Sequence, residues 1–147
     1  MASGFQLDKN FLSNLAHTRG TLNPIGNVVR RRTDDIARKA RGIAIRESAE
    51  ARRESESSGG YSDSARKRSG ELRALWWAMK VYADSIRPTM HGIEDGEDST
   101  TGRVTAYYGG ATAIEFGGSD PEVVVRDGPD HPTHRAHGIL RRAVNGE

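Results

Sequence analysis

A long stretch without proline is the feature that most limits the folds open to this chain of 147 residues. Asn23-Pro24 is a typical helix start, because asparagine caps the first turn and proline loses no hydrogen bond at the first helical position. From there to about Glu56 no other proline occurs, and apolar residues recur at helical spacing. They are Ile25, Val29, Ile36, Ala40 and Ile43. A helix of ~30 residues is ~45 Å long, so part of it must project from the domain or pack on another subunit.

Large apolar side chains are scarce in this sequence. Leu, Ile, Val and Phe number 7, 8, 8 and 3, which is 26 of 147 residues, or about 18%, just under the ~20% below which highly charged chains are expected to be disordered. The formal net charge is only +2, so we expect a folded chain with a lean core. Contacts between subunits would supply part of the missing burial.

Charge is distributed unevenly along the chain. Residues 1–80 hold 16 basic and 9 acidic side chains, whereas residues 81–147 hold 6 basic and 11 acidic ones. Such asymmetry indicates either a face for nucleic acid or contact between the acidic half of one copy and the basic half of the next. The sequence leaves both interpretations open.

Shorter elements are expected around the long helix. Residues 1–22 form an N-terminal arm with a short helix at 8–17, and residues 23–147 form a single domain with a polar linker at about 55–64. Residues 65–87 fit a helical face that ends before Pro88, but WWAMKVYA also has the composition of a strand. The remaining expectations are an acidic loop at 91–102, extended segments at 103–108, 111–116 and 122–126, and a final helix at 136–144. Within the loop, residues 94–98 are expected to be mobile or to meet a basic neighbour.

Several classes of function find no support in the sequence. The absence of Cys excludes disulfides, thiolate zinc sites and a Cys nucleophile. The chain has no phosphate-binding loop and no GxSxG, and no pair of carboxylates stands in apolar surroundings. We therefore expect no catalysis and no cofactor. No run approaches the ~20 apolar residues of a membrane span, and the N-terminus lacks the pattern of a secretion signal, so we expect a protein made in the cytosol, without membrane contact.

Three histidines allow two interpretations. His131, His134 and His137 are spaced by three residues near two aspartates, and His with carboxylate is a ligand set for zinc or iron. Adjacent prolines and glycines argue against a regular ligand helix, and no HExxH accompanies the histidines. A loop with solvent-facing or interfacial histidines is the favoured interpretation, and we expect no metal.

Arginines and tryptophans are the remaining candidates for contact with partners. The run Arg30-Arg31-Arg32 suits phosphate, although the acidic residues that follow it favour a solvated helix face with ion pairs. For Trp76-Trp77, only one ring can be central in either a helix or a strand. The other tryptophan is therefore a candidate interface anchor.

Four segments occur in an order that matches one protein family. They are SGELRAL (69–75), ATAIEFGG (111–118), HP (131–132) and GILRRAV (138–144). The first, second and last are similar to TGRLRxS, YAxxVEFGT and PFLRPAL of the tail-completion, or head–tail joining, proteins of long-tailed bacteriophages. The resemblance spans roughly residues 24–144. Gly118, Gly138 and Arg142 depart from the family pattern, as do an acidic insertion and the segment EVVVR, and these bear on the strand count and the last helix.

The resemblance implies an α+β fold, in which a long N-terminal helix packs on a small, mainly antiparallel sheet and a short C-terminal helix follows. It also implies that residues 76–83 form a strand, and we adopt that prediction over the helical spacing. Phe116 would then be buried between the sheet and the long helix, and Gly117 would permit a turn. The motif residues expected to be structural are Ser69, Gly70, Leu72, Glu115, Phe116, Gly117, His131, Pro132 and Leu140.

The resemblance further implies a structural virion protein without enzymatic activity. It would be one subunit of a homo-oligomeric ring, usually of six copies, that joins the head connector to the tail tube in the phage neck. Its partners would be connector or stopper proteins and tail terminator or tube proteins, with assembly in the host cytoplasm. The candidate residues for the subunit interface or the DNA-carrying channel are Arg38, Arg41, Arg46, Trp76 and Trp77. The alternative is a basic DNA-binding protein that uses the arginine-rich long helix.

Overall fold

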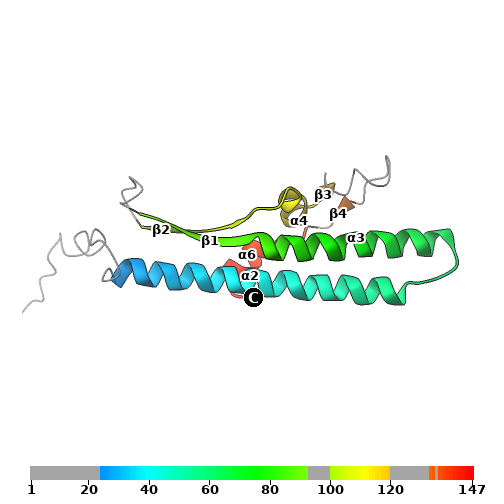
Figure 1. The fold of residues 1–147 in the computed structure, drawn as a ribbon, viewed down its shortest axis with the longest axis horizontal. Coiled ribbons are helices and arrows are strands. Elements are labelled where there is room, and N and C mark those ends of the chain that lie inside the picture. Colours follow the sequence, from blue (N-terminus) through cyan, green and yellow to red (C-terminus); the bar gives the residue numbers. More distant parts are fainter. Residues whose placement is uncertain (1–23, 93–99, 120–132, 135) are drawn as a thin grey trace, which may run out of the picture. The chain divides into compact units, whose positions relative to one another are not determined.

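Two long helices dominate the computed structural model, which describes residues 24–92, 100–119, 133–134 and 136–147. They are α2 (Pro24–Ser57) and α3 (Asp63–Ser85), joined by a short turn at 58–62. The strands β1 (Ile86–His91) and β2 (Thr101–Ala106) follow and pair in a small antiparallel sheet. Figure 1 shows α2 and α3 lying side by side as a hairpin.

Four shorter elements complete the described chain. They are α4 (Ala111–Phe116), β3 (Gly118–Ser119), β4 (Thr133–His134) and α6 (Ile139–Asn145). β3 and β4 pair antiparallel, with Gly118 opposite His134. The α+β fold expected from the sequence, with a long helix, a small antiparallel sheet and a short C-terminal helix, is confirmed.

The described residues fall into two compact units. The first contains the start of α2 up to Asp35 together with Pro88–Arg103, and the second contains Ile36–Arg87 and Val104–Glu147. In the first unit, β2 passes very close to α2 at Gly102. A Cβ atom placed on Gly102 would lie 1.7 Å from Oγ1 of Thr33, so only glycine fits this position without a shift of its neighbours.

Local signals explain where α3 begins and ends. Ser62 is its N-cap, and the hydroxyl oxygen accepts a hydrogen bond from the Ala65 amide at 3.3 Å. Asp63 adds negative charge in the first turn, where it interacts favourably with the helix dipole. At the other end, the residue before Pro88 is disfavoured in the helical conformation, and the chain becomes extended from Ile86 on.

Small side chains line the contact between α2 and α3 in the second unit. The buried residues that α2 contributes along its length are Ala37, Ala40, Ile43, Ala44, Ser48, Ala51 and Ser55. Ser48 donates to the Trp76 carbonyl at 3.2 Å, and Ser55 and Ser69 each donate to the other's carbonyl oxygen, at 2.9 and 3.1 Å. Alanine and hydrogen-bonded serine let two helices approach closely, so this contact needs few large residues.

The larger core residues gather where the remaining elements meet the hairpin. The largest fully buried side chains are Tyr82, Ile43, Met79, Ile86, Ile114 and Ile139. They come from both long helices, the start of β1, α4 and α6. The few large apolar residues are therefore concentrated in one core, which lies beside a helix contact rich in alanine.

Two predicted elements were wrong in type. Residues 76–83, predicted as a strand from the resemblance, lie in the middle of α3, where capping and apolar spacing both favour a helix. Residues 111–116, predicted as extended, form α4, because alanine has the highest helix propensity and Gly110 and Gly117 bound the segment. The predicted linker at 55–64 is also shorter, since α2 continues to Ser57 and Ser55 is buried.

Other expectations were met or fall outside the described residues. The long helix, the final helix and a strand overlapping 103–108 are confirmed. Gly117 has φ 82°, the left-handed region that favours glycine, which confirms its expected role in a turn. The predicted helix at 8–17, the acidic residues 94–98 and the strand at 122–126 lie outside the described residues.

Candidate functional site

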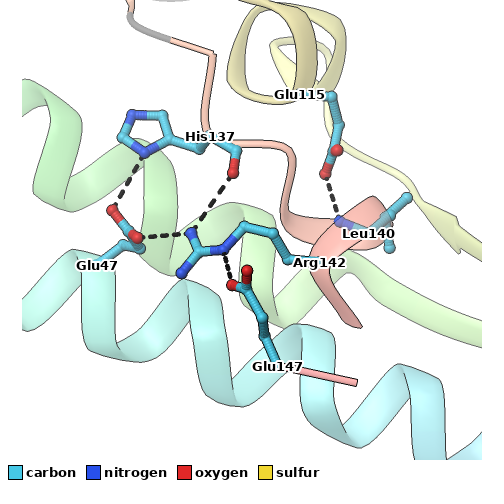
Figure 2. Close-up of polar contacts among 6 residues, drawn as sticks. All are labelled: Glu47, Glu115, His137, Leu140, Arg142 and Glu147. Carbon is cyan, nitrogen blue, oxygen red and sulfur yellow. Dashed lines mark hydrogen bonds and ion pairs between the residues drawn. The ribbon is translucent and has the colours of Figure 1, made fainter. Parts of the chain in front are cut away.

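A cluster of charged side chains holds the C-terminal segment against α2. The Glu47 carboxylate lies 3.1 Å from Nδ1 of His137 and 2.7 Å from Nη1 of Arg142. Arg142 also donates through Nε to the carboxylate of Glu147. Figure 2 shows Glu47 on α2 facing His137 and Arg142, which come from the last described segment. These residues are 90 or more positions from Glu47 in the sequence.

A second polar contact joins α4 to α6 and α3. The buried Tyr82 hydroxyl donates to Oε1 of Glu115, and the Leu140 amide donates to the same oxygen at 2.9 Å. Gly138 precedes α6 in a left-handed conformation and has no side chain with which to cap the helix. Glu115 therefore supplies the acceptor that a capping residue would normally provide.

The electrostatics of both contacts suit structural roles. Burial raises the pKa of Glu47, but the hydrogen bond from Arg142 and the proximity of His137 outweigh burial, so its pKa lies below the ordinary 4.5. Burial, together with the hydrogen bond to Glu115, raises the pKa of Tyr82 far above 10.0. Glu47 is thus ionised and paired at neutral pH, and Tyr82 is neutral. Neither group is tuned to exchange a proton near pH 7.

The histidines do not assemble into a metal site in the described residues. His131 lies outside them, and His134 is described only through its backbone in β4. His137 is turned toward Glu47, and its Nε2 is buried without a hydrogen-bond partner. No group of three or more His, Asp or Glu side chains that could hold a metal ion occurs in the part of the chain that the structure describes.

Some of the predicted interface residues are exposed, and others are half-buried and contact residues of their own chain. Arg38 and Arg46 are exposed on α2, whereas Arg41 is half-buried and donates to the Ile86 carbonyl at 2.6 Å. Trp77 is 54% exposed, and Trp76 is half-buried with the Arg52 guanidinium 5.0 Å from its ring centre. Arg41 thus has one partner in its own chain, and its place at a subunit interface or the channel stays a prediction.

The motif residues also divide into inward and outward positions. Ser69 joins α3 to α2, Leu72 is half-buried on α3, and Leu140 packs against the core. Gly70 lies on the exposed side of α3 with open space around it. The prediction that Phe116 is buried was wrong, because its side chain is 80% exposed while the adjacent Glu115 points inward. His131 and Pro132 lie outside the described residues.

Several exposed large apolar residues were not singled out from the sequence. They are Val28, Ile45, Tyr61, Val81, Tyr107 and Val144. One signal was available in the sequence, because small and apolar residues recur at steps of four, three and four positions. They are Gly70, Ala74, Trp77 and Val81. That spacing marks a second face of α3, away from the buried one.

The comparisons add no relative to this description. In the described part of the chain, no helix combines the length and apolar character that a membrane crossing requires. Comparison with protein families, with curated proteins and with solved structures finds no match to this chain.

Proposed function

We propose that this chain is a structural subunit of a homo-oligomeric ring in the neck of a long-tailed bacteriophage, where it joins the head connector to the tail tube. The family comes from the resemblance of the sequence motifs, and the observation that supports a role in assembly is the exposure of Phe116, which the resemblance had implied to be buried. Glu115 anchors this segment to α3 and α6, so the exposed phenylalanine is held in a fixed place. Aromatic residues are enriched at contacts between proteins, so a phenylalanine held outward in this way is a candidate contact.

The distribution of apolar residues supports a role in assembly. The core of the second unit is filled by alanines and a few large residues, while Trp77, Phe116 and Tyr107 are more than half exposed. A chain with so few large apolar residues that leaves these three outside is expected to bury them against partners. A ring subunit in the neck has such partners on several sides, namely its own copies and the proteins above and below.

The polar cluster supports a structural rather than a catalytic role. Glu47 forms an ion pair with Arg142 and contacts His137, so the cluster ties residues distant in the sequence together. Polar networks of this kind fix the position of a segment, here with Nε2 of His137 as the one buried atom of the cluster that has no hydrogen-bond partner among the described residues. In a ring subunit, a fixed C-terminal segment would present α6 at a constant place to a neighbour.

The mass of the assembled particle tests this proposal. The purified chain should form closed rings of cyclic symmetry, seen by native mass spectrometry and by negative-stain electron microscopy. Addition of a head connector that carries the matching stopper proteins should place one ring on each connector. A chain that stays monomeric at high concentration and binds no connector would contradict the proposal.

DNA binding by the start of α2 is the second candidate function. Arg30, Arg31 and Arg32 are all exposed there, although Arg32 lies 3.9 Å from the carboxylate of Asp35. A binder that uses these arginines should lose affinity for duplex DNA steeply between 50 and 200 mM salt, with a slope of about −0.9 for each phosphate contact. Weak binding that hardly depends on salt would argue against this alternative.

A further inference from the structure

Each long helix carries a row of small and apolar residues at coiled-coil spacing, all of them exposed except the half-buried Ala49 and Ala74. On α2 the row is Gly42, Ile45 and Ala49, which we name the α2 outer seam. On α3 it is Gly70, Ala74, Trp77 and Val81, which we name the α3 outer seam. Steps of three and four residues keep such a row on one face of a helix. Both seams lie in the second compact unit.

These seams are separate from the face on which the two helices pack within one chain. That inner face of α2 contains Ala40, Ala44 and Ala51, all at most 5% exposed, whereas Ile45 is 59% exposed. On α3 the inner face contains Met79 and Ala83, while Trp77 and Val81 point away from it. Each helix of the hairpin therefore has one face for its own partner and a second face that stays largely exposed, although the Lys80 ammonium lies 5.4 Å from the centre of the Trp77 ring.

We infer that the α2 outer seam of one copy packs antiparallel against the α3 outer seam of the next copy. The occupant of each seam is thus a second copy of this chain, and the contact repeats around the ring. This inference rests on the closed ring of the proposed function. When identically oriented hairpins stand side by side, α2 of one copy necessarily runs antiparallel to α3 of its neighbour. An interface between two different faces of this kind is heterologous, and it forms a ring when its rotation closes.

Ring closure selects the register of this contact. Within one chain, Ser48 lies level with Trp76 and Ser55 with Ser69. A closed ring adds no net shift along the helix axes from one copy to the next. The α2 residue that stands at the same height as a given α3 residue must therefore be nearly the same between copies as within one copy. Among the registers that the seam spacing allows, only one comes close, and it places Ile45 level with Val81 of the next copy. A slip of one heptad would displace the helices by about 10 Å.

Size and charge both fit this register. It sets Trp77 against the small Ala49, which gives the large ring a place to pack. It also brings Glu71 within two positions of the level of Arg53, and Asp84 within four positions of the level of Arg38. All four of these charged side chains are exposed. Opposite charges beside an apolar seam favour this pairing over a shifted one.

Site-specific cross-linking tests the contact, because the chain contains no Cys of its own. Ile45→Cys and Val81→Cys are prepared as separate proteins, mixed under assembly conditions and treated with a short bis-maleimide. The mixture should give a cross-linked dimer in at least roughly tenfold higher yield than either protein alone. The double variant should give a ladder that stops at the number of subunits in the ring. Ala74→Cys mixed with Ile45→Cys is the matched control, because it reports the register shifted by one heptad.

The outcomes of this experiment show separately whether the inferred interface and the proposed neck function hold. A ring seen by native mass that gives no Ile45–Val81 cross-link overturns the inference and leaves the ring intact. A cross-link formed equally well by Val81→Cys alone indicates a two-fold contact and also overturns it. A specific ladder from particles that bind no connector supports the interface and contradicts the neck function. A monomer without any cross-link contradicts both.

Charge exchange provides an independent test of the register. Arg38→Glu and Asp84→Arg should each weaken association by roughly fivefold, as expected for a repulsive pair at a rim. The protein that carries both substitutions should recover most of the loss, because the opposite charges meet again. Failure of the double variant to recover, while each single variant remains folded by circular dichroism, would overturn the assigned register.

Discussion

Glu115 should contribute far more to stability than its aromatic neighbour Phe116. Replacement of Glu115 by alanine removes the acceptor shared by the buried Tyr82 hydroxyl and the Leu140 amide. A hydrogen bond to a charged group contributes about 1.5–3 kcal/mol. Because both donors share Oε1, the two losses are not independent, and we expect Glu115→Ala to lower the free energy of unfolding by about 3 kcal/mol. For a chain of this length that corresponds to a fall in Tm of roughly 6–12 °C.

Phe116→Ala is the matched control for that substitution. Its side chain is 80% exposed, so its removal should change the free energy of unfolding by at most about 0.5 kcal/mol. Urea unfolding followed by circular dichroism measures both variants, under conditions in which the chain is monomeric. Glu115→Gln, which keeps an acceptor oxygen, should fall between the native chain and Glu115→Ala. A loss of about 3–5 kcal/mol for Phe116→Ala would be that of a buried phenylalanine and would refute the outward position of this residue.

Three further predictions concern the helix contact, β2 and the polar cluster. Ala44→Leu should overpack the fully buried contact between α2 and α3 and cost about 1–3 kcal/mol in urea unfolding, whereas Gly42→Ala, whose added Cβ meets nothing within 4 Å, should stabilise by about 0.5–1 kcal/mol. Gly102→Ala should lower Tm through its clash with Thr33, and Thr33→Ala should relieve part of that loss. Because the folded pKa of Glu47 lies below 4.5, its contribution should be fully present above that pH and disappear as the pH falls through the folded pKa. The stability difference between the native chain and Glu47→Gln, measured from pH 6 to pH 3, should therefore shrink on acidification.

The long helix was predictable because its signals are local. Proline at its first position, the absence of later proline and the recurring apolar residues all act within the segment itself. The same kind of signal was present in α3, where Leu75, Met79 and Tyr82 follow helical spacing. The strand prediction for 76–83 failed because a pattern taken from the resemblance was preferred to the spacing of this chain's own residues.

Burial was harder to predict than helical structure. Ser55 stands in a polar stretch that reads as a linker, yet a hydroxyl that bonds across two helices is small enough for their closest contact. Phe116 is apolar and was expected inside, but α4 turns Glu115 inward instead. The sequence pattern does not indicate which of these two adjacent residues faces the core. The contact of Glu47 with His137 joins residues 90 positions apart, and no local spacing encodes it. These features depend on how elements meet, which a single sequence does not specify.

The few large apolar residues of this chain lie in two kinds of place, one core and the outside of the helical hairpin. A contact built from alanine and hydrogen-bonded serine holds α2 and α3 together without consuming leucine or isoleucine. The few large residues are then divided between one core, around Tyr82 and Ile114, and the outside of the hairpin, where Ile45 and Trp77 stand. If the chain had evolved only to be stable alone, exposed tryptophan and isoleucine on these helices would add a risk of aggregation without benefit. Their placement at coiled-coil spacing on both helices fits the contact between copies that we infer.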